Sequence, residues 1–222
     1  MKVFKSWREY WDFSVNVRFH ERYIHTKETQ EFLNTVVYTI RDRRKRIIEK
    51  TILWRAQLGH DEDKANYHMP IQYHFDRMKP MNDKAREGRA NPKGIPHLYL
   101  ATDKNTAISE VRPGVGSYVS VAKFVTKKEL SVIDCSNDRI LYPKFYWDEP
   151  GDNIKEQHVW SDINEAFSSP VNPTEDLADY APTQILADLF KREGYDGIVY
   201  ESSLGEGKNV VLFDIDVADA VY

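Results

Sequence analysis

The stretch from Gly88 to Pro113 places the strongest constraint on how this chain can fold. It reads GRANPKGIPHLYLATDKNTAISEVRP and combines a loop, a short apolar strand and the start of a helix. The polar and charged side chains of this run fall at the junctions between the elements: Arg89, Tyr99, Glu110 and Arg112. Rigid flanking elements hold such side chains in place at little entropic cost. The run therefore predicts a small-molecule site.

The composition favours one globular unit without a nucleic-acid or membrane partner. The chain has 222 residues, of which 41% are hydrophobic, enough for one substantial core. The formal net charge is −4, with acidic and basic residues interspersed. The dense basic run RDRRKR at 41–46 is interpreted as the solvated face of a helix, because the overall charge is negative. Direct nucleic-acid binding is therefore not expected.

Cysteine usage and the absence of long apolar runs indicate the cellular compartment. Cys135 is the only cysteine, which excludes a disulfide framework or a cysteine-rich metal site. The first residues, MKVFKSWREYW, contain scattered charges and no apolar leader, and no later run approaches membrane-spanning length. These features predict a soluble cytoplasmic protein.

Residues 1–50 are predicted to form a helical extension packed on the core that residues 51–222 build. Thr26 can cap a helix whose apolar residues follow at helical spacing and continue to Ile47 and Ile48. The apolar residues in question are Phe32, Leu33, Val36, Val37 and Ile40. An upstream aromatic group predicts a second packed element, and it consists of Trp7, Tyr10, Trp11, Phe13 and Phe19.

The rest of the chain mixes strands and helices without regular βαβ alternation, which predicts an α+β fold. Strands are expected at 52–54, 98–101, 118–125, 130–134, 197–200 and 210–213. Asp103 or Asn105 is expected to cap a short helix that reaches Glu110, and a helix beginning near Pro182 should end at Gly194. The segment 135–178 is predicted to be an irregular insertion or lid, with only a short helix near 162–167.

Several familiar catalytic signatures are absent from the sequence. GEGKN at 205–209 lacks the spacing of a Walker loop, and PGVGSY at 113–118 precedes a strand instead of opening a helix. His68 and His74 lack zinc-site spacing, so no metal is expected. No GxSxG elbow surrounds Ser202 or Ser203.

The remaining candidates each have a structural alternative. Arg55 could pair with a carboxylate, Tyr99 could belong to the core, and Ser202 and Asn209 could make turn hydrogen bonds. Glu110 is different, because a carboxylate near the end of a helix opposes the helix dipole, which Arg112 could offset locally. That placement favours a functional role for Glu110.

Taken together, these candidates lie in blocks that resemble the RES-domain family, which is named for its arginine, glutamate and serine. The blocks are LWRAQ at 53–57, the run at 88–113, DYAPTQILADLFKREGYDGIVYESS at 179–203 and NVVLFD at 209–214. They occur in the family's order and cover most of residues 53–214. On this basis residues 51–222 are expected to be the RES catalytic domain. The N-terminal extension and segment 135–178 exceed the compact plan of the family's toxins.

The resemblance implies a fold related to ADP-ribosyltransferases, with a mixed or split sheet and flanking helices, and an enzyme that consumes NAD⁺. By position, the family's catalytic residues fall on Arg55, Glu110 and Ser202, with Ser203 as an alternative to Ser202. The residues expected to bind NAD⁺ are Arg55, Arg89, Tyr99, Ser202 and Asn209. The family also implies a toxin with an Xre-like helix-turn-helix antitoxin as partner.

The residue types suit this chemistry. Breaking the nicotinamide–ribose bond creates oxocarbenium character, which a carboxylate such as Glu110 can stabilise. Arginines bind pyrophosphate bidentately, Tyr99 can stack on nicotinamide, and Ser202 can hold its amide or the ribose. The acceptor of ADP-ribose stays open among phosphate, water and a protein. A catalytically silent NAD⁺- or nucleotide-binding module and a nucleic-acid protein are the alternatives.

Overall fold

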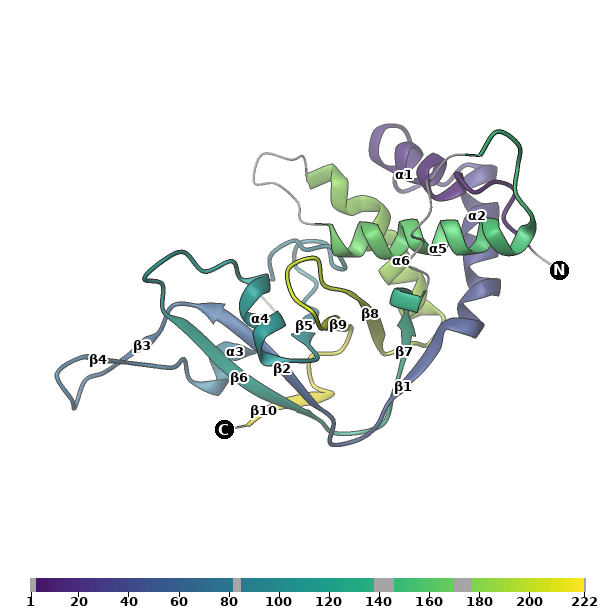
Figure 1. Cartoon of the computed structure of the whole chain (residues 1–222). Helices are drawn as coiled ribbons and strands as arrows, with labels where there is room; N and C mark the ends of the chain where they lie inside the picture. Colours follow the sequence, from purple (N-terminus) through teal and green to yellow (C-terminus); the bar gives the residue numbers. More distant parts are fainter. Residues whose placement is uncertain (1–2, 82–84, 138–145, 170–176, 222) are drawn as a thin grey trace.

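The computed structural model describes residues 3–81, 85–137, 146–169 and 177–221, and it has an α+β fold, as predicted (Figure 1). The strands are β1 (Arg44–Ile47), β2 (Ile52–Leu58), β3 (Asp61–Asp63), β4 (Met69–Ile71), β5 (Leu98–Ala101), β6 (Val119–Thr126), β7 (Leu130–Asp134), β8 (Gly197–Glu201), β9 (Lys208–Leu212) and β10 (Ala218–Val221). The helices are α1 (Glu9–Phe19), α2 (Lys27–Thr39), α3 (Phe75–Met78), α4 (Lys104–Glu110), α5 (Asp152–Ser168) and α6 (Ala181–Arg192).

Within these residues, one mixed sheet of eight strands organises the molecule. Its order is β1-β7-β8-β9-β5-β2-β6-β10, and β3 and β4 form a separate hairpin that projects from the body (Figure 1). Strands β7 and β8 are parallel, whereas the other neighbours in the sheet are antiparallel. Strands β2 and β5, whose residues are all described, are paired at one position, Trp54 opposite Ala101. The sheet is therefore nearly split at this point, in keeping with the expected split sheet.

The two faces of the sheet are filled by alternating residues of its central strands. Ile133 and Ile198 point into a core shared with the helices, whereas their neighbours Val132 and Val199 belong to the core on the opposite face. This period of two is inherent in the pleat of a strand. The chain between the parallel strands β7 and β8 contains α5 and α6, which cover the first of these faces.

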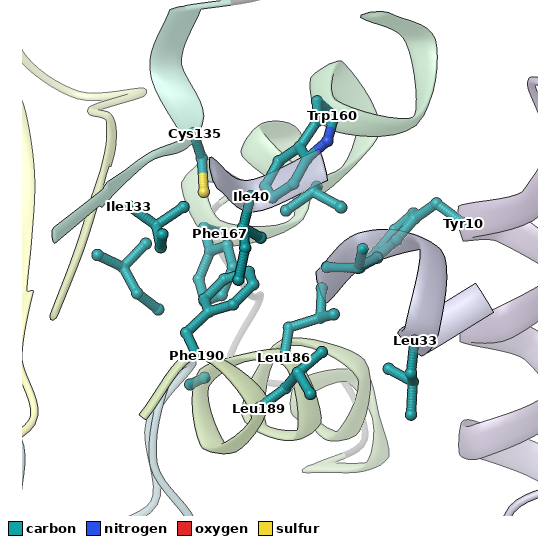
Figure 2. Close-up of a cluster of buried hydrophobic side chains, with 14 of the residues drawn as sticks. Tyr10, Leu33, Ile40, Ile133, Cys135, Trp160, Phe167, Leu186, Leu189 and Phe190 are labelled. Atoms are coloured by element: carbon teal, nitrogen blue, oxygen red, sulfur yellow. The ribbon is translucent and has the colours of Figure 1, made fainter. Parts of the chain in front are cut away.

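The core between the helices and the sheet is rich in aromatic side chains. Figure 2 shows side chains from α2, β7, α5 and α6 converging on one another. Trp160 is fully buried, stacks on Phe190 with ring centroids 6.2 Å apart, and donates a hydrogen bond from Nε1 to Oγ1 of Thr39 at 3.1 Å. The N-terminal helices thus share their core with the sheet.

The N-terminal region confirms the predicted cap and corrects two other predictions. The Thr26 side chain accepts a hydrogen bond from the Thr29 backbone amide and caps α2. The upstream aromatics are not all core residues, because Trp11 and Phe19 are 62% and 61% exposed.

The predicted continuation of that helix through Ile48 is wrong. After α2 the chain forms a short 3₁₀ segment, η1 (Ile40–Arg43), and then β1, which pairs antiparallel with β7. The basic run is therefore divided between a 3₁₀ turn and an edge strand. Pairing with a strand that lies far along the chain overrides local helical spacing.

Segment 135–178 contains a long helix where irregular structure with one short helix was predicted. Helix α5 has 17 residues and packs against β8. Three of its buried positions carry polar side chains: His158, Ser161 and Asn164. These interrupt the apolar stripe of Val159, Ile163 and Phe167 and hide the helical period. One face of α5 belongs to the core, and 138–145 and 170–176 lie outside the described residues.

The other predicted elements agree closely with the structure. Strand β5 has the predicted bounds, and Asp103 caps α4 by accepting a hydrogen bond from the Thr106 amide at 2.9 Å. Pro182 lies in the first turn of α6, and Gly194 follows that helix with φ +85°. Strand β2 is longer than predicted, and β10 was not predicted. No helix of the described ranges combines the length and the apolarity that crossing a membrane requires.

Candidate functional site

A cleft of about 760 Å³ opens where β2 and β5 diverge. This volume lies within the roughly 300–1,000 Å³ typical of small-molecule pockets. Its lining comes from β2, β5, the last turn of α4 and the strands β8 and β9: the polar side chains include Arg55, Tyr99, Glu110, Tyr200 and Asn209. Four of the residues predicted from the sequence to act on NAD⁺ therefore line one cleft: Arg55, Tyr99, Glu110 and Asn209.

Glu110 lies at the centre of a hydrogen-bond network between α4 and the β8–β9 hairpin. Oγ of Ser202 and Nδ2 of Asn209 both donate to Oε1 of Glu110, each at 2.7 Å. Two donors on one carboxylate oxygen fix its orientation and stabilise its charge. Oε2 accepts no hydrogen bond from the described residues. The carboxylate is thus oriented by one oxygen and can interact with a ligand through the other.

The two serines Ser202 and Ser203 make different contacts. Ser202 Oγ donates to Glu110 and accepts hydrogen bonds from the backbone amides of Leu204 and Gly205 at 3.1 and 3.0 Å. Ser203 is exposed, and its hydroxyl donates to the Ser168 carbonyl at 2.9 Å. Ser202, not Ser203, is therefore the serine that contacts the carboxylate.

A second network fastens α4 to the loop between β8 and β9. The Thr106 hydroxyl is fully buried, donates to the Asp103 carboxylate at 2.7 Å and accepts from the Gly207 amide at 2.9 Å. The Lys208 amide donates to Oγ1 of Thr102 at 2.9 Å. These bonds hold the helix that ends in Glu110 against the loop that begins at Ser202.

Gly207→Ala is expected to lower activity at the site without unfolding the protein. A Cβ at this position would lie 1.8 Å from Asp103 Oδ2 and 2.7 Å from Thr106 Oγ1, so the cap of α4 must move. The displaced helix would shift Glu110 from its two donors. If Glu110 acts on a substrate, as the sequence predicts, such a displacement should lower the rate about 10²-fold. Steady-state kinetics and a thermal melt of both proteins test this, with Gly114→Ala as control because only Ser117 Oγ, at 3.6 Å, lies near its Cβ. Unchanged turnover in Gly207→Ala would contradict the proposed coupling.

Arg55 is a half-buried cation without a carboxylate partner among the described residues. Its Nη1 donates to the Tyr99 carbonyl at 3.5 Å, across the split between β2 and β5. Burial lowers the pKa of Arg55 to about 10, which leaves the guanidinium charged at neutral pH. The alternative that Arg55 is held in an ion pair with a carboxylate is therefore not supported, and its guanidinium can interact with a ligand in the cleft.

Tyr99 fixes the loop that precedes β5. Its hydroxyl donates to Asn91 Oδ1 at 2.6 Å and accepts from the Ala90 amide at 3.0 Å. Burial raises the pKa of Tyr99, so the phenol is neutral. Gln184 of α6 binds the same loop through the Gly88 and Asn91 carbonyls at 2.9 and 3.1 Å. The loop is thereby held at the mouth of the cleft.

Arg89 does not line the cleft. Its guanidinium donates to the Phe167 carbonyl near the end of α5. This contact gives Arg89 a structural role in joining the loop to the helix, and its position does not favour the predicted contact with NAD⁺.

Sequence reasoning missed several residues that line the cleft: Trp54, Gln57, Tyr73, Arg77 and Arg86. Tyr73, Arg77 and Arg86 come from the connection 60–97, which shows no periodicity in the sequence. Arg77 stacks on the Tyr73 ring, 3.8 Å from its centroid, and pairs with Asp61 at 2.8 Å. These three residues reach the cleft because the connection 60–97 folds beside β2 and β5, and the sequence contains no local pattern that predicts this.

The described residues contain no group of three or more side chains suited to hold a metal ion. The two histidines considered above pair with single carboxylates instead: His68 with Glu62 at 2.8 Å, and His74 with Asp76 at 3.1 Å.

Comparisons with known proteins give the family. A search of curated proteins found no match. Among solved structures, the chain is similar to one in the crystal structure of the M. tuberculosis MbcT–MbcA toxin–antitoxin complex. That match has 13% identity and a TM-score of 0.43, and covers 84% of this chain and 89% of the other. The family profile of the RES domain matches residues 52–222, a range that includes Arg55, Glu110 and Ser202. This protein therefore belongs to the RES domain family.

Proposed function

We propose that this protein is an enzyme that cleaves the nicotinamide–ribose bond of NAD⁺ and transfers ADP-ribose to an acceptor. The observation that carries the proposal is the Glu110 carboxylate, oriented by Ser202 and Asn209 inside a cleft of suitable volume. Membership of the RES domain family supports it. From the sequence resemblance, the arginine, glutamate and serine that name the family are expected at Arg55, Glu110 and Ser202.

In the proposed reaction, the bond between ribose C1′ and the nicotinamide nitrogen breaks and its electron pair leaves with nicotinamide. Positive charge develops on the ribose, as in glycoside cleavage. The free oxygen of Glu110 stabilises that charge or accepts a hydrogen bond from a ribose hydroxyl. An oxygen of the acceptor then bonds to C1′ and releases a proton. Phosphate, water and a protein side chain all supply such an oxygen.

The surrounding side chains have distinct proposed roles. Arg55 supplies a fixed positive charge for a phosphate oxygen. Tyr99 and Tyr200 line the same cleft. Because the Tyr200 ring already stacks on Phe167, Tyr99 is the proposed stacking partner of the nicotinamide ring. Ser202 and Asn209 act mainly through Glu110, so they are positioning residues in this proposal.

The test is incubation of the purified protein with NAD⁺, with and without inorganic phosphate, followed by mass analysis of the products. Free nicotinamide is expected in both cases if water serves as acceptor, and only with phosphate if the enzyme is a phosphorylase. If proteins of an added cell extract gain the mass of ADP-ribose, the enzyme is a transferase. NAD⁺ that stays intact under all three conditions would overturn the proposal, and NAD⁺ that binds but stays intact would favour a silent binding module. The antitoxin partner, the toxin role and the cytoplasmic location stay predictions from the sequence.

A further inference from the structure

A second compartment of about 410 Å³ adjoins the cleft that holds Glu110. The two compartments share five lining residues, which together form the neck between them: Arg55, Gln57, Arg77, Arg86 and Tyr99. Three of the five are arginines, and none is acidic. The three arginines come from β2, from α3 and from the loop before β5, so the fold gathers them from separate parts of the chain.

The charge at this neck is only partly neutralised. Arg77 pairs with Asp61, but Arg55 and Arg86 have no carboxylate within ion-pair distance in the described part of the chain. The acidic residues in the two linings are Glu87 and Glu110. Glu87 accepts a hydrogen bond from Gln184 at 3.1 Å, and Glu110 accepts two, from Ser202 and Asn209. Uncompensated guanidinium groups at a cleft are characteristic of a site for a phosphate-bearing ligand.

The compartment beyond the neck offers a different environment. Besides the shared residues, its lining includes the apolar or uncharged residues Met81, Ala85, Pro96 and His97 and the charged residues Lys79 and Glu87. The charge of Lys79 is already paired with Asp219 at 2.6 Å. Burial, together with the charge of Lys191, lowers the pKa of His97 to about 4, so this imidazole is neutral at pH 7. Such a lining suits a heterocyclic base better than a second charged group.

We propose that the neck is a diphosphate subsite in which Arg86 and Arg77 join Arg55, and that the second compartment receives the adenosine half of a dinucleotide. This inference rests on the proposed function, because it assumes that the nicotinamide end lies beside Glu110. It assigns ligand-binding roles to two arginines outside the blocks that resemble the family. It also moves the second phosphate contact from Arg89 to Arg86.

Calorimetric titration with ADP and with adenosine tests the subsite independently of catalysis. The wild-type protein should bind ADP at least about tenfold more tightly than adenosine, since charge-assisted hydrogen bonds to phosphate add affinity on that order. Arg86→Gln should weaken ADP binding about tenfold and leave adenosine binding unchanged. Arg77→Gln should weaken it less, because Asp61 already neutralises part of its charge.

Arg46→Gln is the matched control. Arg46 is exposed on the edge strand β1, far in the sheet order from β2 and β5, and pairs with Glu129 at 3.8 Å. ADP affinity in this variant should equal that of the wild type. Arg86 is also exposed, so its replacement should leave the melting temperature unchanged.

Equal ADP affinity in the wild type and Arg86→Gln would overturn the subsite, as would wild-type ADP binding no tighter than adenosine binding. Neither result depends on turnover. If NAD⁺ stays intact while the ADP results are as expected, the proposed reaction fails and the subsite holds. If NAD⁺ is cleaved while Arg86→Gln binds ADP normally, the subsite fails and the reaction holds.

Discussion

Glu110→Gln is expected to lower the turnover of NAD⁺ roughly 10²- to 10⁴-fold, the range that single acid–base or electrostatic groups contribute in enzymes. The amide oxygen of glutamine can still accept the hydrogen bonds that Ser202 and Asn209 donate to Oε1. The variant therefore keeps the geometry and loses the negative charge. Nicotinamide release under saturating NAD⁺ measures the effect.

The control for this variant is Glu129→Gln, which removes an exposed carboxylate that pairs only at the surface with Arg46. Its turnover should match that of the wild type, and both variants should show unchanged circular dichroism. A Glu110→Gln protein that turns over NAD⁺ at the wild-type rate would refute the catalytic role of this carboxylate. Unfolding of that variant would instead indicate a structural role.

Trp160→Ala is expected to destabilise the fold by about 3–5 kcal/mol, as large aromatic-to-alanine changes in cores do. Trp160 is fully buried, stacks on Phe190 and lies 4.4 Å from the guanidinium carbon of Arg43 across its ring face. Its removal leaves a cavity in the core between α5 and α6 and deprives Arg43 of its aromatic partner (Figure 2). Urea unfolding followed by circular dichroism measures the loss.

Two further variants separate the effect of burying the tryptophan side chain from the effect of its hydrogen bond. Trp11→Ala removes the same side chain from a largely exposed position on α1 and should change stability by no more than about 0.5 kcal/mol. Thr39→Val removes the acceptor of the Trp160 indole and should cost about 1–3 kcal/mol, the penalty of an unsatisfied buried donor. A Trp160→Ala protein as stable as Trp11→Ala would show that this core is not where the helices and sheet are held together.

Local signals in the sequence predicted the elements around Glu110 well. The bounds of β5, the Asp103 cap and the end of α6 at Gly194 all follow from short-range preferences, and all agree with the structure. Only 162–167 of helix α5 were predicted to be helical, because buried polar residues such as His158 and Asn164 interrupt its apolar stripe. Strand β1 escaped prediction because its partner β7 lies more than 80 residues along the chain, beyond any local pattern.

By itself, the sequence determined which reactive residue types belong to which elements: an arginine in a buried strand, a glutamate that closes a short helix and a serine before a glycine loop. Only the tertiary structure decided which of them meet. Ser202 and Asn209 reach Glu110 from 92 and 99 residues away, Arg89 turns to α5, and Arg77 and Arg86 enter the neck of the cleft. Residue type and spacing are encoded locally, whereas distances between remote side chains depend on strand pairing and core packing across the whole chain.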